Sequence, residues 1–155
     1  MKVTRRSVIG LMAAAILAKA GTVALADDAI ITVHKDPNCG CCSGWVQHLR
    51  DAGFNVRVEE TSDLAAVRTR LGIPAELTAC HTAEVAGYQV EGHVPATAVK
   101  RLLAEHPSAK GLAVPGMPVG SPGMEGGHPQ PYTVVLFGPD GHKPYMRFVG
   151  TEAVG

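Results

Sequence analysis

The sequence lacks a surplus of charge of either sign, because its 155 residues contain 14 Lys and Arg against 14 Asp and Glu. Four of the basic residues lie within the first 26 residues, which contain no acid, so the remainder is acidic by four charges. A nucleic-acid-binding protein would need a basic patch or stripe. We therefore expect no nucleic-acid partner.

The chain also lacks an apolar run long enough to anchor it in a membrane. The run at residues 8–18 falls short of the roughly 20 residues that a transmembrane helix needs. It is followed by Ala24-Leu25-Ala26, the small-x-small pattern that signal peptidase cleaves. Thr4-Arg5-Arg6-Ser7-Val8-Ile9 resembles a twin-arginine export motif. We predict a signal peptide at residues 1–26, cleaved after Ala26, and a periplasmic domain at residues 27–155.

Cysteines are few, and no second spaced pair accompanies the first. Cys39, Cys41 and Cys42 fall within four residues, whereas Cys80 stands alone. Structural zinc sites typically use two separated Cys/His pairs, which makes structural zinc the weaker interpretation. An even number of cysteines in an exported protein ordinarily indicates disulfides. Adjacent cysteines rarely bond to each other, however, so the crowding needs another explanation.

Local patterns predict one α/β domain with a mixed sheet. The chain is long enough for a single hydrophobic core, and it contains no internal repeats. Its first half alternates strand and helix, which implies a short parallel sheet with crossover helices. We expect strands at residues 29–33, 54–58, 84–90, 132–137 and 145–149, and helices at residues 43–52, 63–71 and 95–105.

Turn and capping signals divide these elements. Ser62 is expected to cap the second helix, which ends at Gly72. Pro139-Asp140-Gly141 is typical of the turn of a C-terminal hairpin. Residues 111–131 form a long loop rich in glycine and proline. Long ordered loops in a compact domain are often functional.

Cys39 and Cys42 form a Cys-x-x-Cys pair where a predicted strand leads into a helix. The helix N-terminus has free amide donors and a positive dipole end, which stabilise a thiolate. Cys41 adds a third sulfur in the same turn. Three thiolates so close together would repel one another unless a cation lay between them. The pattern therefore favours metal binding over disulfide chemistry alone.

Thiolate and thioether ligands select soft ions, above all copper(I). Cys80 and His93 flank one predicted strand, so both can project from its ends toward the cysteine turn. Met117 and Met124 lie in the long loop, where no helix or strand face offers them a core to pack on. The candidate copper ligands are Cys39, Cys41, Cys42, Cys80, His93, Met117 and Met124.

The other sulfur, imidazole and indole groups receive structural interpretations. Met146, inside a strand, and Trp45, on the apolar face of the first helix, are expected in the core. The role of His81, beside Cys80, stays open. We expect solvated side chains at His34, His48, His106, His128 and His142.

Four segments of unusual composition carry a resemblance to a known family. They are residues 35–42 with Trp45, 79–83, 90–96 and 116–125. In these segments the sequence resembles the periplasmic CopG-type copper-resistance family, first catalogued as a domain of unknown function and distinct from the repressors that share the name.

The resemblance implies a thioredoxin-like fold that binds copper(I), as one ion or a small cluster, with a role in copper redox handling. It implies Cys39, Cys42, Cys80 and His93 as ligands, joined by Cys41, Met117 and Met124. Thioredoxin-like folds usually have a cis-proline before the strand that faces the Cys-x-x-Cys pair, and Pro131 and Pro118 are candidates.

Three functions stay open. The leading one is a periplasmic copper(I)-binding protein that sequesters copper, passes it to other periplasmic copper-handling proteins, or changes its oxidation state. The alternative is a thiol–disulfide oxidoreductase in which Cys39 attacks and Cys42 resolves. The third is a small domain stapled by two disulfides.

Overall fold

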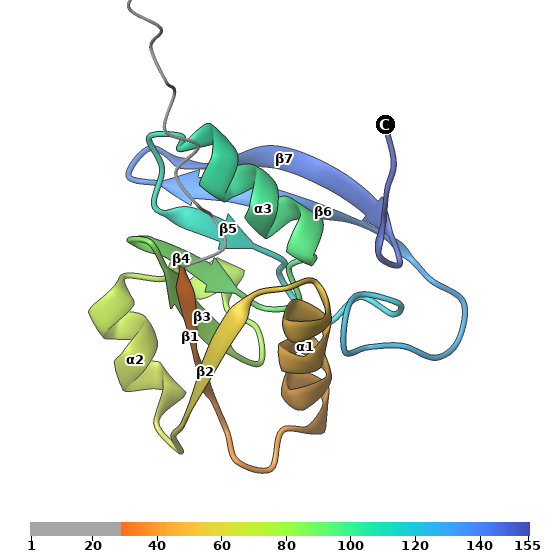
Figure 1. The fold of residues 1–155 in the computed structure, drawn as a ribbon. Coiled ribbons are helices and arrows are strands. Elements are labelled where there is room, and N and C mark those ends of the chain that lie inside the picture. The colour runs from red at the N-terminus through yellow and green to blue at the C-terminus, as the bar shows by residue number, and fades with distance from the viewer. Residues whose placement is uncertain (1–28) are drawn as a thin grey trace, which may run out of the picture.

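The computed structural model describes residues 29–155. The predicted signal peptide and its cleavage site lie outside this range. The described chain folds into one mixed sheet of eight strands with three α-helices and one short 3₁₀ helix, which confirms the mixed α/β class (Figure 1). The elements are β1 (Ile30–Lys35), α1 (Gly40–Asp51), β2 (Asn55–Glu60), α2 (Leu64–Leu71), η2 (Ala75–Leu77), β3 (Thr82–Val85), β4 (Tyr88–Glu91), α3 (Ala96–Glu105), β5 (Gly111–Ala113), β6 (Pro131–Gly138), β7 (Gly141–Val149) and β8 (Glu152–Ala153).

The sheet order is β2-β1-β3-β4-β5-β6-β7-β8. β1 and β2 are parallel and joined by α1, as predicted, and β4 and β5 are also parallel. All the other neighbouring strands are antiparallel, so the expectation of a mainly parallel first half holds only for β1 and β2. α2 therefore leads into a strand that runs against β1, and is no parallel crossover.

The single strand predicted at residues 84–90 is wrong. The segment forms the hairpin of β3 and β4, in which Thr82 pairs with Glu91 and Val85 with Tyr88. Its turn residues, Ala86 and Gly87, both have positive φ values of 47° and 84°. Alanine rarely adopts that conformation, so the turn has a weak sequence signal.

The helix starts also differ from prediction. α1 begins at Gly40, three residues early, because the side chain of Cys39 caps it by accepting from the amide of Cys42. α2 is capped by Asp63 and not by Ser62, since the Asp63 carboxylate accepts from the amide of Ala66 at 2.9 Å. α3 and the β6–β7 hairpin are confirmed.

The predicted loop at residues 111–131 is shorter than expected. Its first three residues form β5, which is buried between β4 and β6. A strand of three residues is too short to produce a periodic pattern. Neither Pro118 nor Pro131 is preceded by a cis peptide bond, and there is none among residues 29–155.

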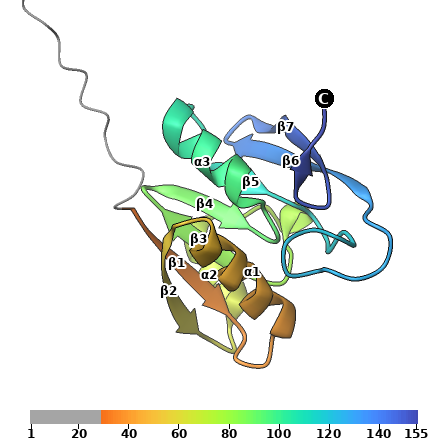
Figure 2. The ribbon, with the colours of Figure 1, turned by 45° about the vertical axis from the view of Figure 1, so that its right-hand side comes forward.

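The two faces of the sheet differ. One face carries the apolar core, in which Ile31 and Val33 of β1 pack with the buried residues of α1 and α3. On the opposite face the positions of β3 and β4 are polar, and Arg68 and Arg70 of α2 reach Glu91 and Glu84 there. A smaller apolar cluster of Leu77, Ala113 and Phe137 lies apart from the main core. Figure 1 shows α1 and α2 on opposite sides of β1 and β3, and in the view of Figure 2 α1 lies in front of α2. No helix within residues 29–155 is long and apolar enough to cross a membrane.

The strand register fixes which loops meet. His34, near the end of β1, pairs with Thr82 at the start of β3, and Thr82 pairs with Glu91 at the end of β4. The segments that follow β1, precede β3 and follow β4 therefore lie at one end of the sheet.

Gly92 is confined where β4 leaves the sheet, and we expect its replacement to destabilise the fold. It has a φ of 73°, and a Cβ there would lie 2.6 Å from the Val114 carbonyl oxygen and 2.7 Å from the Ala79 Cβ. Gly92→Ala adds this overlap to a left-handed strain of about 1–2 kcal/mol. Gly87→Ala is the matched control, because Gly87 also has positive φ but open space around it. In urea unfolding, Gly92→Ala should lose clearly more stability than Gly87→Ala, and equal losses would contradict the packing argument.

Candidate metal centre

The turn that precedes α1 holds the first two sulfurs. Cys39 and Cys42 are joined by a disulfide, with their Cα atoms 5.4 Å apart. The sulfur of Cys39 accepts a hydrogen bond from the Cys42 amide at 3.3 Å. The predicted Cys-x-x-Cys pair thus lies at the strand-to-helix junction, and here it is oxidised. The interpretation with two structural disulfides does not match this structure, because Cys41 and Cys80 are free.

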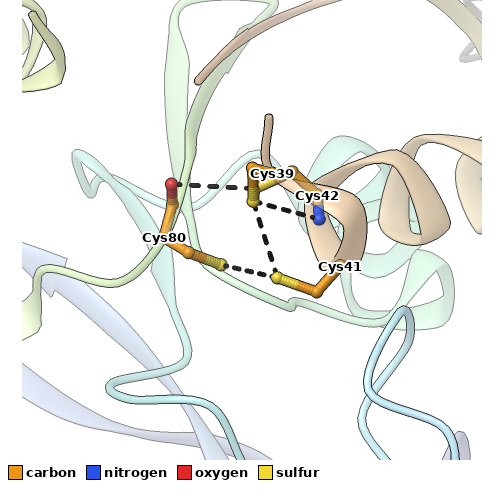
Figure 3. Close-up of side chains that lie close together, drawn as sticks. All are labelled: Cys39, Cys41, Cys42 and Cys80. Carbon is orange, nitrogen blue, oxygen red and sulfur yellow. Dashed lines mark hydrogen bonds between the residues drawn. A yellow bond between two sulfur atoms is a disulfide. The ribbon is translucent and has the colours of Figure 1, made fainter. Parts of the chain in front are cut away.

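Cys41 and Cys80 complete a group of four sulfurs (Figure 3). The sulfur of Cys41 lies 3.5 Å from that of Cys39 and 3.7 Å from that of Cys80. All four sulfurs lie within 4.8 Å of one another. The strand register therefore brings Cys80 to the turn although 37 residues separate it from Cys42 in the chain. Such a group can hold a metal ion once the disulfide is reduced.

The thiol of Cys80 is held in its neutral form. Burial, and then the neighbouring Cys41, raise the pKa of Cys80 to about 12. A thiolate there would be poorly solvated and would repel a second thiolate. A metal ion that binds Cys80 must displace its proton, and its positive charge would remove the repulsion.

His93 is oriented toward the sulfur group from the segment after β4. Its ring is fully buried, and Nδ1 lies 2.8 Å from the Pro122 carbonyl oxygen. A carbonyl only accepts, so Nδ1 carries the proton and Nε2 presents its lone pair to the Cys80 sulfur at 2.8 Å. Burial lowers the pKa of His93, which keeps the ring neutral. Metal-binding histidines are commonly oriented by such a second hydrogen bond.

His81, left open by the sequence, also belongs to the cluster. It is fully buried, and its Nδ1 lies 3.4 Å from the Cys80 sulfur. Its ring packs on Trp45 at a centroid distance of 4.3 Å and meets His93 edge-on at 4.9 Å. Burial, with the nearby His93, lowers the pKa of His81 to about 3. Cys80, His81 and His93 form a second group of potential ligand atoms within 4.8 Å.

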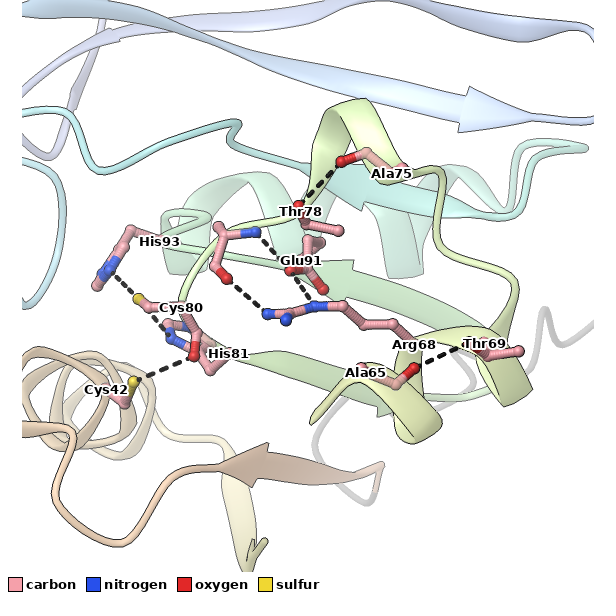
Figure 4. Close-up of polar contacts among 11 residues, drawn as sticks. Cys42, Ala65, Arg68, Thr69, Ala75, Thr78, Cys80, His81, Glu91 and His93 are labelled. Atoms are coloured by element: carbon pink, nitrogen blue, oxygen red, sulfur yellow. Dashed lines mark hydrogen bonds and ion pairs between the residues drawn. The ribbon is translucent and has the colours of Figure 1, made fainter. Parts of the chain in front are cut away.

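A buried ion pair holds the loop that carries Cys80 (Figure 4). Glu91 is fully buried and accepts from Arg68 at 2.9 Å and from the Ala79 amide at 2.7 Å. Arg68 also donates to the Ala79 carbonyl oxygen at 2.6 Å. The backbone amide and carbonyl of Ala79, the residue before Cys80, are therefore both hydrogen-bonded to the Arg68–Glu91 pair. Sequence reasoning missed it, because the partners come from α2 and β4.

Residues 114–130, between β5 and β6, carry Met117 and Met124 and are called the methionine loop here. The backbone of this loop packs against the cysteine turn. Gly44 of α1 is so close to the loop that a Cβ on it would lie 2.9 Å from the Gly123 Cα. A Cβ on Gly123 would in turn overlap the backbone of Cys41 and Trp45. The half-buried Met124 thus lies in a segment beside the cysteine turn, whereas the side chain of Met117 is 54 % exposed. A ligand role for either stays a prediction.

Two of the five histidines that were expected to be solvated are instead buried or half-buried. His34 is buried and pairs with Glu84 at 2.9 Å and Glu59 at 3.4 Å. His48 is half-buried, and its Nε2 accepts from the Ala96 amide at 3.0 Å, which caps α3. Carboxylates on neighbouring strands and an open helix end are tertiary partners that local sequence does not reveal. The prediction holds for the exposed His106, His128 and His142.

The core assignments of Trp45 and Met146 are confirmed. Trp45 is fully buried and donates from its indole nitrogen to the Val94 carbonyl oxygen at 2.8 Å. Met146 is partly buried and packs against the main core. The bond to Val94 also ties α1 to the segment that carries His93.

The fold and the cluster define a mixed α/β domain with a cysteine–histidine centre capable of binding a metal ion. Two solved structures resemble it, and both bear the name copper resistance protein CopG. Form 1 is 45% identical, with a TM-score of 0.73, and the match covers 78% of this chain and 98% of that one. Form 2 is 44% identical, with a TM-score of 0.70, and the match covers 82% and 98%.

The chain belongs to the CopG copper-resistance family, as the resemblance in sequence implied. The model of a protein family described as "Protein of unknown function, DUF411" matches residues 77–124. This range contains Cys80, His81 and His93. A comparison with curated proteins found no match.

Glu91→Gln should destabilise the protein strongly, because it leaves the partly buried Arg68 without its counter-charge. Breaking a buried pair by removing one partner typically costs about 3–5 kcal/mol. Urea unfolding would measure the loss. Glu105→Gln is the control, because Glu105 pairs with Arg101 on the exposed surface. Its midpoint should hardly move. A similar small effect from both substitutions would contradict a structural role for the Arg68–Glu91 pair.

Proposed function

We propose that this protein is a periplasmic copper(I)-binding protein that serves copper resistance by sequestering copper, passing it on or changing its oxidation state. The observation that carries the proposal is the convergence of four cysteine sulfurs within 4.8 Å, with Cys80 shared by a histidine group. The names of the related structures support copper as the metal. A thioredoxin-like assignment of the fold and export by the predicted signal peptide are part of the proposal.

The chemistry of the ligands supports copper(I) as the cargo. A sulfur-rich group with a neutral imidazole suits a soft ion, and thiolates favour copper(I) among the metals available to proteins. We assign Cys39, Cys41, Cys42, Cys80 and His93 as ligands, with Met117 and Met124 as thioether ligands from the loop. Four thiolates so close together can hold more than one ion by bridging.

Loading through all four sulfurs requires the reduced protein. Reduction of the Cys39–Cys42 disulfide takes up two electrons and two protons, and metal binding then releases protons from the thiols. The oxidation state of this pair therefore sets how many sulfurs are available. The physiological partners we expect are copper ions and other periplasmic copper-handling proteins.

Copper(I) titration of the reduced protein tests the function. Under anaerobic conditions and against a competing chelator, Cys80→Ser should weaken binding by more than the roughly 10–100-fold that loss of an outer-shell partner costs. Cys80 belongs to both groups of ligand atoms, so its loss disrupts both. Ser43→Ala is the control, because Ser43 lies in the same turn with an exposed side chain. Binding by the reduced protein no tighter than by a variant without cysteines would refute the proposal.

A second function, thiol–disulfide exchange, is favoured by the disulfide between Cys39 and Cys42. In it, Cys39 attacks a substrate disulfide and Cys42 resolves the mixed disulfide, which oxidises the pair and reduces the substrate. Cys39 is partly exposed, whereas Cys42 is buried. This arrangement gives each cysteine a different role.

An insulin-reduction assay separates the two functions. If exchange is the function, the double variant Cys41→Ser/Cys80→Ser should retain the activity of the unmodified protein. If copper binding is the function, that variant should lose tight copper binding, and neither form should reduce insulin appreciably faster than a Cys39→Ser control. High activity that survives the double substitution would place thiol exchange first.

A further inference from the structure

A cavity of about 320 Å³ lies between α1 and the edge strand of the sheet, β2. Figure 1 shows these two elements side by side. The cavity is separate from both groups of candidate metal ligands, since none of those cysteines and histidines lines it. Its volume is at the low end of the roughly 300–1,000 Å³ of small-molecule sites. The proposed copper function leaves this cavity without a role.

Lys35, at the end of β1, gives the cavity a buried positive charge. Its side chain is only 5 % exposed, and its ammonium lies 3.6 Å from the Glu60 carboxylate and 3.5 Å from the Pro37 carbonyl oxygen. Both contacts are longer than the roughly 2.7–3.2 Å of good N–H···O hydrogen bonds. An ammonium has three N–H donors, so Lys35 is able to bind a further anionic partner at a shorter distance.

The other walls of the cavity favour a small monoanion with an apolar part. Arg50 adds a second positive charge, and Glu60 is the one acidic residue of the lining, so the net charge of the cavity is positive by one. Val46 and Val58 supply apolar surface. A monocarboxylate with a short carbon chain complements both properties, whereas a dianion would leave one of its charges unpaired.

One end of the cavity adjoins the Cys39–Cys42 disulfide. Ser43 lines the cavity and donates from its hydroxyl to the Cys39 carbonyl oxygen at 3.3 Å. The contact of Lys35 with Pro37 is to the turn that leads into Cys39. Two lining residues therefore contact the backbone within two residues of Cys39. Cys39 is partly exposed and Cys42 is buried, so a group that arrives from the cavity meets Cys39 first.

We infer that the cavity binds the carboxylate of a small carboxylate-bearing thiol, and that this thiol reduces the Cys39–Cys42 disulfide. The carboxylate pairs with the Lys35 ammonium, and the carbon chain extends past Ser43 toward Cys39. The inference rests on the proposed copper function, because loading through all four sulfurs requires the reduced pair. It adds a binding site and the chemical class of the reductant.

The reduction consumes two molecules of the thiol for each disulfide. The thiolate of the first molecule attacks the Cys39 sulfur, which forms a mixed disulfide and breaks the bond to Cys42. The Cys42 sulfur leaves as a thiolate and takes up a proton. The thiolate of the second molecule attacks the reductant sulfur of the mixed disulfide, and Cys39 leaves and is protonated. The two protons and two electrons lost by the reductant, which becomes its own disulfide, are those gained by the two cysteines.

The rate of reduction by 3-mercaptopropionate tests the inference, with the uncharged amide of the same thiol as the comparison. The oxidised protein is mixed anaerobically with each thiol, and the cysteine thiols that form are alkylated and counted by mass spectrometry. The ratio of the two rates is compared between protein variants, so the intrinsic reactivities of the two thiols cancel. Lys35→Met should lower this ratio about tenfold, because a hydrogen-bonded charge pair is lost.

Arg57→Met is the matched control for the loss of a positive charge. Arg57 is 62 % exposed and bonds to Thr32, and it does not line the cavity. Its substitution should leave the ratio of rates unchanged. A ratio that Lys35→Met leaves at the wild-type value, or that Arg57→Met lowers equally, would overturn the inference.

Propionate, which has no thiol, tests the cavity without the redox step. In amide proton–nitrogen NMR spectra, propionate should shift the Ser43 and Gln47 signals of the wild-type protein until they saturate, and should not do so in Lys35→Met. The dispersion of the spectrum verifies the fold of the variant. Arg50→Met, at an exposed position, should also weaken propionate binding and keeps the test available if Lys35→Met folds poorly. Shifts that do not saturate, or that are equal in the wild-type protein and both variants, would overturn the inference.

Copper(I) titration after reduction by an uncharged phosphine keeps this inference apart from the proposed function. If the reduced protein binds copper(I) and the preference for the carboxylate thiol is absent, only the cavity inference fails. If the reduced protein binds no copper(I) and the preference persists, the proposed function fails, and the cavity still directs reduction of the disulfide.

Discussion

The antiparallel pairing of β1 with β3 is the interaction on which the candidate metal centre depends. It sets Thr82 opposite His34, so the chain enters β3 beside the turn that leaves β1. That register brings the Cys80 sulfur to within 3.7 Å of Cys41. A shift of one residue would turn every β3 side chain to the opposite face of the sheet, and would bury the polar positions in the apolar core. Packing of the apolar core therefore sets the register of β3 against β1, and this register sets the position of Cys80 relative to the cysteine turn.

Cys80 is the residue where the two groups of potential ligands meet. Its sulfur lies 3.7 Å from the Cys41 sulfur, 3.4 Å from His81 Nδ1 and 2.8 Å from His93 Nε2. Burial, and then the neighbouring Cys41, raise the pKa of Cys80, which keeps its thiol protonated in the absence of a metal ion. The same burial makes a cation the natural counterpart of any thiolate formed there, because a low-dielectric site strengthens the attraction.

Hydrogen bonds from several elements hold the segments that carry the candidate ligands in place. Glu91 and Arg68 bind both backbone groups of Ala79, and His93 is held by Pro122 from the methionine loop. Trp45 links α1 to Val94 and packs against His81. The cysteine turn, the hairpin and the loop are therefore connected by hydrogen bonds and packing on several sides. Such support fixes ligand orientation more closely than isolated loops would.

The sequence by itself determined the α/β class, the Cys-x-x-Cys at a helix start, the β6–β7 hairpin and the sulfur-rich inventory, because these depend on local periodicity, turn chemistry and residue type. Tertiary structure decided the rest. The β3–β4 turn uses Ala86, which carries no turn signal, so one strand was expected and two formed. His81 and His93 lie 12 residues apart in the chain, yet face one sulfur because the hairpin returns to its starting end. His34 and His48 form hydrogen bonds or ion pairs with residues of other elements. Long-range pairing sets these contacts, and no local pattern encodes which distant group a side chain will meet.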